Sequence, residues 1–189
     1  MTKREDARQF IELGDGSRWY ADRTDQEHYA PVVAASLSKL CRFTGHCSVF
    51  YSVAEHSVKA SYMVTPEFAL EALLHDAHES ICNDLSKPVK IHIGGSYADL
   101  EAQVELESRK SFGLTPHISA EVKLADDYMV CIEAHYLLSS GGKQWEHYDN
   151  IREMAIDASR TNPYFQPSGW LPERGYEEFM RRFNELTQK

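Results

Sequence analysis

The chain has 189 residues, enough to bury a hydrophobic core, and we expect one domain over residues 1–189. Its net charge of −9 argues against a broad nucleic-acid-binding face, which would need a basic patch, so we expect no nucleic-acid partner. No apolar run approaches the length of a membrane span, and the first residues do not resemble a signal peptide. We therefore expect a cytoplasmic protein without a membrane partner.

The cysteines form no Cys-x-x-Cys pair, which argues against zinc ligation and against a disulfide framework. We expect them to be scattered small hydrophobic residues in a reducing compartment. They are Cys41, Cys47, Cys82 and Cys131.

Most of the chain has helical patterns, after a short β-hairpin expected at residues 9–20 around a Gly-rich turn. The predicted helices cover residues 31–41, about 52–64, 65–81, 96–113, 119–141 and 176–186, with loops at 83–88 and 162–172. The third helix starts with Thr65 as N-cap and Pro66 at its first position. Ser96-x-x-Asp99 opens the fourth. Repeated helices with short loops predict an all-α bundle.

Two histidines and two aspartates stand in predicted helices in the order His56, His75-Asp76 and Asp126. His56 follows Val53 by three residues, so it lies on the apolar face of its helix. A histidine or carboxylate that faces a core needs a partner, because burial of a lone charge is costly. These four groups can therefore converge on one divalent metal ion.

Helical phase also separates two adjacent carboxylates. Asp126 shares a helix face with Val122 and Met129. Asp127 follows Lys123 by four residues and is expected to pair with it at the surface. The inward carboxylate is therefore Asp126.

The helix that carries His56 also has an expected outer face. Glu55 and Lys59 are four residues apart and should form an ion pair on that face. This arrangement leaves Glu55 solvated and outside the metal site.

Imidazole and carboxylate ligands together suit Mn²⁺, Co²⁺, Zn²⁺, Ni²⁺ or Fe²⁺. One such ion, held with open positions, generates hydroxide from water near neutral pH, which indicates a hydrolase. The alternative is a satisfied core histidine beside unrelated helix-face aspartates. The occurrence of all four groups in order favours the metal site.

Two further carboxylates follow the His-Asp pair. Glu79 is four residues after His75 and shares its face, and Asp84 follows in the predicted break. A carboxylate near a metal-bound water can orient or deprotonate it, and a second can protonate a leaving oxygen. The alternative for Glu79 is a helix-surface carboxylate.

Cationic side chains flank the same region. Lys87 and Lys90 are reasonable phosphate contacts, although a solvated loop is the alternative for both. Upstream, Arg42 offers a guanidinium that can bind phosphate oxygens with two hydrogen bonds. A small phosphorylated substrate needs only a few such cations despite the acidic net charge.

These motifs resemble the HD-domain metal phosphohydrolases, and most closely the bacterial 5′-deoxynucleotidase branch and its prophage-encoded relatives. The resemblance covers residues from about 37 to 138. Its pieces are Cys41-Arg-Phe-Thr-Gly-His, Phe50-Tyr-Ser-Val-Ala-Glu-His-Ser-Val, Ala72-Leu-Leu-His-Asp-Ala-His-Glu, Asn83-Asp-Leu-Ser-Lys-Pro-Val-Lys and Val122-Lys-Leu-Ala-Asp. It implies an HD-domain helical bundle and one metal ion bound by the four ligands above.

The resemblance also implies roles around the metal. Glu79 and Asp84 match carboxylates that act in catalysis or contact substrate, and Lys90 matches a phosphate-side lysine. Arg42 matches an arginine near the substrate phosphate, followed here by Phe43 where the branch often has tryptophan. His46 is typical of the prophage-like relatives.

The implied activity is release of phosphate from a deoxynucleoside 5′-monophosphate, a small-molecule nucleotide substrate. One alternative is a deoxynucleoside triphosphate triphosphohydrolase, for example acting on dATP, with the same residues. A second is a nucleotide-binding module of the same fold that has lost turnover. The sequence leaves open whether the protein forms a homo-oligomer.

Overall fold

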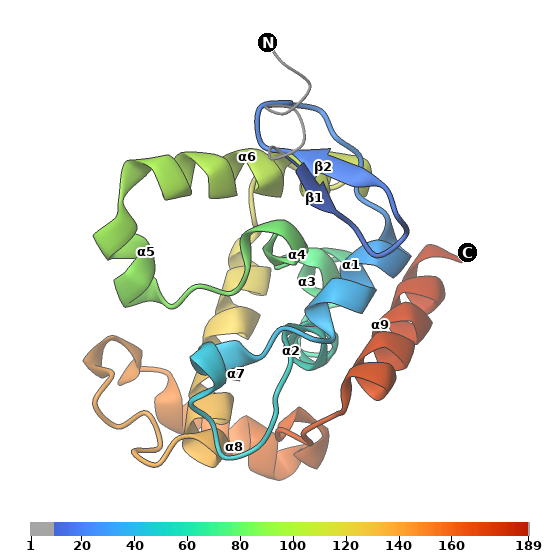
Figure 1. Ribbon diagram of the computed structural model, residues 1–189. Helices are drawn as coiled ribbons and strands as arrows, with labels where there is room; N and C mark the ends of the chain where they lie inside the picture. The colour runs from blue at the N-terminus through green and yellow to red at the C-terminus, as the bar shows by residue number, and fades with distance from the viewer. Residues whose placement is uncertain (1–9, 189) are drawn as a thin grey trace.

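Residues 10–188 are described by a computed structural model, which is mostly helical with a β-hairpin near the N-terminus (Figure 1). Strands β1 (Phe10–Glu12) and β2 (Arg18–Tyr20) pair antiparallel. The Trp19 indole is buried, and its Nε1 donates a hydrogen bond to Glu107 Oε2 (3.2 Å). The predicted hairpin is therefore confirmed, although its expected first residue, Gln9, lies outside the described residues.

Several helices pack around α2 (Val53–Ala60), and short 3₁₀ turns join some of the helices (Figure 1). The helices are α1 (Ala30–Leu37), α2 (Val53–Ala60), α3 (Ala69–Leu74), α4 (Glu79–Cys82), α5 (Lys87–Ile93), α6 (Gly95–Ser111), α7 (Ala120–Leu137), α8 (Arg152–Thr161) and α9 (Pro172–Thr187). The 3₁₀ turns are η2 (Arg42–Gly45), η3 (Glu146–Tyr148) and η4 (Pro163–Phe165). The predicted all-α fold with a short hairpin is confirmed. Within residues 10–188, no helix combines the length and apolar character that crossing a membrane requires.

Helix α2 lies at the centre of the core, since every residue from 51 to 60 is buried. It packs against α3, α7 and α9. Val58 belongs to a hydrophobic cluster with Leu37, Leu73 and Phe179. Close packing on all sides restricts side-chain movement, which bears on His56 because that residue lies on α2.

Glu55 and Lys59 form the predicted ion pair (3.2 Å), but both side chains are fully buried, so the expected solvated outer face is wrong. The segment 163–170, between α8 and α9, covers the pair. The ammonium donates hydrogen bonds to two backbone carbonyl oxygens of this segment, and the carboxylate accepts from two of its backbone N–H groups. The partners are Tyr164 O (2.9 Å), Gln166 O, Ser168 N (2.6 Å) and Trp170 N (2.7 Å).

The single helix predicted over residues 65–81 is two helices, α3 and α4, joined by a turn at residues 75–78. Hydrogen bonds in the turn run over three residues, as from Ala77 N to Leu74 O (3.0 Å). Ala72 O would accept from Asp76 N in a continuous α-helix. Instead it accepts from the ring nitrogen Nδ1 of His75 (2.8 Å). The turn thus places the His-Asp pair between two helices rather than within one.

Helix α5 lies where the sequence predicts only a break. Pro88 occupies the first turn of α5, where proline fits, so it begins a helix instead of only ending one. Gly94, at φ 79°, separates α5 from α6. Helix α6 begins at Gly95 without a side-chain cap, so the capping box predicted from Ser96 is wrong.

Other helix ends differ by a few residues from the predictions. Helix α1 ends at Leu37, α3 begins four residues after Thr65, and α7 ends at Leu137 because Leu138 is extended. Helix α9 begins early, at Pro172, and α8 was not predicted. The N-terminal end of α7 is capped, since the Ser119 hydroxyl accepts from Val122 N (3.3 Å).

Candidate metal centre

The four predicted ligands come from three segments that are far apart in the sequence. His56 lies on α2, His75 and Asp76 lie in the turn after α3, and Asp126 lies on α7. The two imidazoles are buried, whereas the side chains of Asp76 and Asp126 are 14% and 33% exposed. The centre therefore opens to solvent on its carboxylate side.

The ligand atoms meet at one point. The Nε2 atoms of His56 and His75 are 3.3 Å apart, and Asp126 Oδ1 lies 3.3 Å and 3.8 Å from them. Asp76 Oδ2 lies 3.6 Å and 3.2 Å from the same two nitrogens. Metal–nitrogen bonds of about 2.0–2.1 Å in a tetrahedral site separate neighbouring ligand atoms by about 3.4 Å. The observed separations fit that geometry, and the ligand atoms of His56, His75 and Asp126 all lie within 4.8 Å of one another.

Hydrogen bonds orient both imidazoles toward this point. His56 Nδ1 donates to Glu133 Oε1 (2.6 Å), and His75 Nδ1 donates to Ala72 O (2.8 Å). A proton on Nδ1 leaves the Nε2 lone pair of each neutral ring for a metal ion. The donor set and its outer contacts therefore fit a borderline divalent cation.

Electrostatics also favour a cation here. Burial alone would raise the pKa of Asp126, but hydrogen bonds from His56 and His75 hold it well below its usual value. Burial lowers the pKa of His75, but the charge of Asp76 and the contact with Asp126 outweigh this and raise it. A metal ion would compete with a proton for this negatively charged point.

Glu133 belongs to the candidate centre, but its place there was not predicted from the sequence. Its fully buried carboxylate accepts hydrogen bonds from His56, from Tyr51 Oη (3.0 Å) and from Arg42 Nε (3.0 Å). It lies seven residues after Asp126, two helical turns along the same face of α7. That spacing was the available signal in the sequence.

Arg42 joins this outer carboxylate to the ligands. Its buried guanidinium uses Nε for Glu133, and its Nη1 lies 3.5 Å from Asp76 Oδ2. Burial disfavours the charged form, but Glu133 and neighbouring aspartates outweigh it and keep the pKa of Arg42 well above its usual value. Arg42 therefore contributes a fixed positive charge beside the centre.

The turn η2 after Arg42 has unusual backbone geometry. Phe43 and Thr44 have φ of 55° and 54°, and Gly45 has φ of 77°. Left-handed geometry in a bulky residue such as phenylalanine costs energy and is concentrated at functional sites. The turn directs the Phe43 ring against Trp145, with ring centroids 6.3 Å apart.

Glu79 and Asp84 both lie near the ligands. Burial and the charges of Asp76 and Asp84 raise the pKa of Glu79 well above its usual value, and its Oε2 is buried without a hydrogen-bond partner. Burial also raises the pKa of Asp84, although the nearby positive charge of Arg42 acts in the opposite direction. Asn83, between them, has φ 65° and ψ 158°, a region that non-glycine residues rarely adopt.

The remaining predicted cations are less closely held. Lys90 Nζ donates to Glu101 Oε1 (2.5 Å), so its charge is already paired, although that charge partly opposes the rise in the pKa of Glu79. Lys87 is exposed at the start of α5. His46 is exposed after η2, and no side-chain hydrogen bond or ion pair joins it to another described residue.

Two of the cysteines are not scattered, which corrects the expectation for them. Cys41 and Cys47 flank η2 with their Sγ atoms 3.8 Å apart, and both are free thiols. Cys82 and Cys131 are buried, as expected of small hydrophobic residues.

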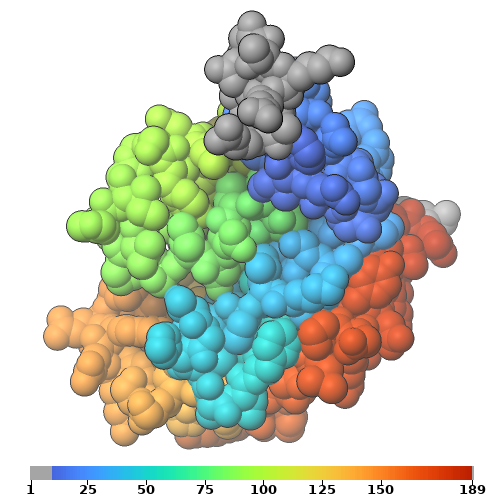
Figure 2. Space-filling model, in the orientation of Figure 1, coloured from blue at the N-terminus to red at the C-terminus, as the bar shows by residue number. Residues whose placement is uncertain are grey.

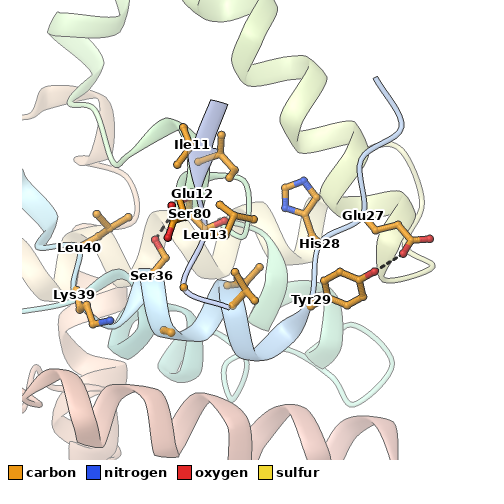
Figure 3. A pocket seen from close by; sticks show the side chains of 15 residues that line it. Ile11, Glu12, Leu13, Glu27, His28, Tyr29, Ser36, Lys39, Leu40 and Ser80 are labelled. Carbon is orange, nitrogen blue, oxygen red and sulfur yellow. Dashed lines mark hydrogen bonds between the residues drawn. The ribbon is translucent and has the colours of Figure 1, made fainter. Parts of the chain in front are cut away.

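A cavity of about 300 Å³ lies elsewhere, between the hairpin, α1 and α4 (Figure 3). Ile11, Leu13, His28 and Tyr29 are among the side chains that line it. Ser80 and Ile81 of α4 reach it, but none of the four predicted ligands does. This cavity is therefore separate from the candidate metal centre.

No family model matches the chain. It is 33% identical over 113 residues to an uncharacterized protein of Rhodobacter capsulatus, covering 55% of this chain and 58% of that protein. It is 36% identical over 180 residues to the Escherichia coli (strain K12) protein named Uncharacterized protein YfdR, covering 95% of this chain and 96% of that protein. Similarity of this extent shows that the chain belongs to the same family as YfdR.

Proposed function

We propose that this protein is a metal-dependent phosphohydrolase that releases phosphate from deoxynucleoside 5′-monophosphates. The convergence of two oriented imidazole nitrogens with the Asp76 and Asp126 carboxylates, beside the fixed charge of Arg42, carries the proposal. The motif resemblance to HD-domain phosphohydrolases supports the same reaction. One divalent ion, Mn²⁺, Co²⁺, Zn²⁺, Ni²⁺ or Fe²⁺, would be the cofactor.

When bound, the ion supplies Lewis-acid polarisation and a lowered pKa for a coordinated water. Its ligands would be His56, His75, Asp76 and Asp126. The side chain of Glu79, with its raised pKa and unpaired Oε2, positions a water or moves a proton.

Substrate binding falls to the cations and aromatic groups around the centre. Arg42 offsets phosphate charge, because its Nη2 lies outside the contacts with Glu133 and Asp76. Lys90, Lys87 and His46 add positive charge or hydrogen-bond donors toward the phosphate, and the Phe43 ring lies beside Arg42. Asp84 provides the second carboxylate for proton transfer to the leaving oxygen.

A substrate panel with metal analysis tests the proposal. The protein is loaded separately with each of the five metals and given deoxynucleoside and ribonucleoside monophosphates and deoxynucleoside triphosphates. We expect inorganic phosphate from the deoxynucleoside monophosphates. Release of triphosphate from triphosphates would favour the alternative reaction, and nucleotide binding without turnover would favour a binding module.

Asp76→Ala ties the activity to the centre. The variant should lose both bound metal and turnover while circular dichroism shows unchanged helix content. Asp157→Ala is the matched control, because Asp157 lies at the surface with its side chain 67% exposed. Full metal content and normal turnover in Asp76→Ala would contradict the assignment.

A further inference from the structure

The segment between α7 and α8, residues 138–151, carries aromatic side chains toward the candidate metal centre. The Trp145 ring lies nearly parallel to that of Phe43, at an interplanar angle of 21° and a centroid distance of 6.3 Å. Tyr148 lies next, with its ring centroid 6.3 Å from that of Trp145. All three rings are partly exposed. We call Phe43, Trp145 and Tyr148 the aromatic wall.

Hydrogen bonds hold this segment in place. Arg152 Nη2 donates to Gly142 O (3.1 Å) and to Trp145 O (2.7 Å), and its Nη1 donates to Asp149 Oδ1 (2.5 Å). Gly142 has φ 69°, and a Cβ there would lie 2.8 Å from the Ala134 side chain and 3.6 Å from the Trp145 ring. The Trp145 indole is therefore packed in a defined position near α7, and a side chain at residue 142 would disturb it.

The aromatic wall adjoins the centre from two sides. On one side, the Phe43 ring centroid is 5.8 Å from the Arg42 guanidinium carbon, and that guanidinium reaches Asp76. On the other side, Tyr148 packs against a hydrophobic cluster that contains Met129, and Met129 lies one turn after Asp126 on α7. Figure 2 shows the orange segment after α7 lying against the cyan segment that contains η2, on one face of the molecule.

We propose that Trp145, with Phe43 and Tyr148, forms the surface on which the planar base of a nucleotide lies while its phosphate is at the metal centre. This inference rests on the proposed function and adds a specificity-determining residue to it. Flat aromatic rings stack on any base, because every base has a π-face. The aromatic wall therefore selects nucleoside phosphates over phosphate esters without a base, and it discriminates weakly among the bases.

The size of the effect follows from stacking. Loss of one base–aromatic stack lowers affinity by about 5- to 150-fold. We expect Trp145→Leu to raise KM for deoxynucleoside monophosphates within that range. The variant should leave kcat/KM for deoxyribose 5-phosphate, which lacks a base, unchanged. Trp145→Phe, which keeps an aromatic plane, should restore most of the nucleotide affinity.

Tyr29→Leu is the control, since Tyr29 is a partly exposed aromatic at the separate cavity (52% exposed) (Figure 3). Tyr29→Leu should leave KM for the nucleotide and kcat/KM for deoxyribose 5-phosphate unchanged. Equal losses on the nucleotide and on deoxyribose 5-phosphate in Trp145→Leu would overturn the proposal, because they indicate damage to the centre. Unchanged nucleotide KM would overturn it as well.

Fluorescence gives a binding measurement that does not depend on turnover. Trp19 and Trp170 are buried, at 4% and 3% exposed, so Trp145 is the tryptophan open to a ligand. A deoxynucleoside monophosphate added to the Mn²⁺-loaded protein should quench tryptophan emission, and Trp145→Phe should remove that quenching. Quenching without hydrolysis would uphold the aromatic wall while the proposed reaction fails. An absence of quenching would overturn the aromatic wall even in an active enzyme.

Discussion

His56 and His75 each use one ring nitrogen for a hydrogen bond within the protein and present the other to the same point. The anchors differ, since Glu133 is a buried carboxylate and Ala72 O is a backbone carbonyl. A carboxylate anchor raises the basicity of its imidazole and adds negative charge near the metal. At the scale of single residues, the roles of the surrounding carboxylates can therefore be separated by experiment.

The adjacent aspartates of α7 should behave differently. Asp126 Oδ1 lies 3.3 Å from His56 Nε2, whereas Asp127 pairs with Lys123 at 3.8 Å near the surface. Loss of an outer hydrogen-bond partner lowers metal affinity by about 10- to 100-fold. Asp126→Asn removes a ligand, so it should lower metal affinity by more than that. Asp127→Asn should stay close to wild type. Metal titration and phosphate release check this, and equal losses would mean that the helical phase was misread.

Glu79→Ala tests the assignment of a proton-transfer group. The carboxyl is buried, lacks a partner for Oε2 and is not needed to complete the ligand set. Its removal should lower kcat by about 10²-fold or more, the usual scale for general acid–base catalysis, with unchanged metal content. Rescue of turnover by saturating Mn²⁺ would instead assign Glu79 to metal binding.

Glu133→Gln should show the opposite pattern. The amide keeps one oxygen that can accept from Arg42 Nε, but an NH2 group replaces the oxygen that accepts from His56 and Tyr51, so His56 loses its carboxylate partner. Metal affinity should fall by about 10- to 100-fold, and excess metal should restore turnover. Measured metal affinity close to wild type would show that this contact is only structural.

At the scale of elements, α2 is fixed by the segment that covers it. The buried Glu55–Lys59 pair holds four backbone groups of residues 163–170. The Lys59 ammonium also lies 5.4 Å and 5.3 Å from the ring centroids of Tyr164 and Trp170. Since His56 lies on the same helix, this contact links the position of a metal ligand to the chain before α9.

Lys59→Met should therefore destabilise the fold strongly. Removal of one member of a buried pair leaves an uncompensated charge and costs about 3–5 kcal/mol. Lys123→Met is the matched control, because Lys123 is 70% exposed in its pair with Asp127 and such pairs contribute about 0–1 kcal/mol. Urea unfolding followed by circular dichroism measures both. A loss in Lys59→Met no larger than that of the control would refute the role of the pair.

At the scale of the whole molecule, the candidate centre joins α2, α7 and the turn after α3. These segments span residues 56 to 126, so a bound ion would cross-link the middle of the chain in the folded state alone. Ligands that bind only the folded state stabilise it by mass action. Metal occupancy should consequently be visible in global stability.

Chelation should lower the melting temperature. Metal at about 100 times its Kd stabilises the fold by about 2.7 kcal/mol, which corresponds to about 5–11 °C for a chain of this size. Differential scanning calorimetry with Mn²⁺, and with excess chelator, measures the shift. Asp76→Ala should melt at the same temperature in both conditions. An unchanged wild-type melting temperature would argue against metal binding.

Local sequence pattern determined much of this protein. Helical spacing predicts the all-α fold and the separation of Asp126 from Asp127, because side-chain direction in a helix depends on position alone. The Gly-rich turn predicts the hairpin. The same helical spacing predicts a core stripe of Leu70, Leu73, Leu74, Ala77 and Ile81. Leu73, Leu74 and Ala77 are buried, whereas Leu70 and Ile81 are only partly buried. The inward direction of His56 and Asp126 also follows from this spacing, whereas the meeting of all four ligands depends on how three segments pack.

Only the tertiary structure decided the features that depend on contacts between distant segments. Glu55 and Lys59 are buried because residues 163–170 lie over them, which no local pattern indicates. The role of Glu133 depends on hydrogen bonds to Arg42 and His56, 91 and 77 residues away in sequence. The turn at 75–78 brings His75 and Asp76 to His56 and Asp126, which lie on two other elements. Helical periodicity describes one segment at a time, whereas these contacts exist only after the segments have packed together.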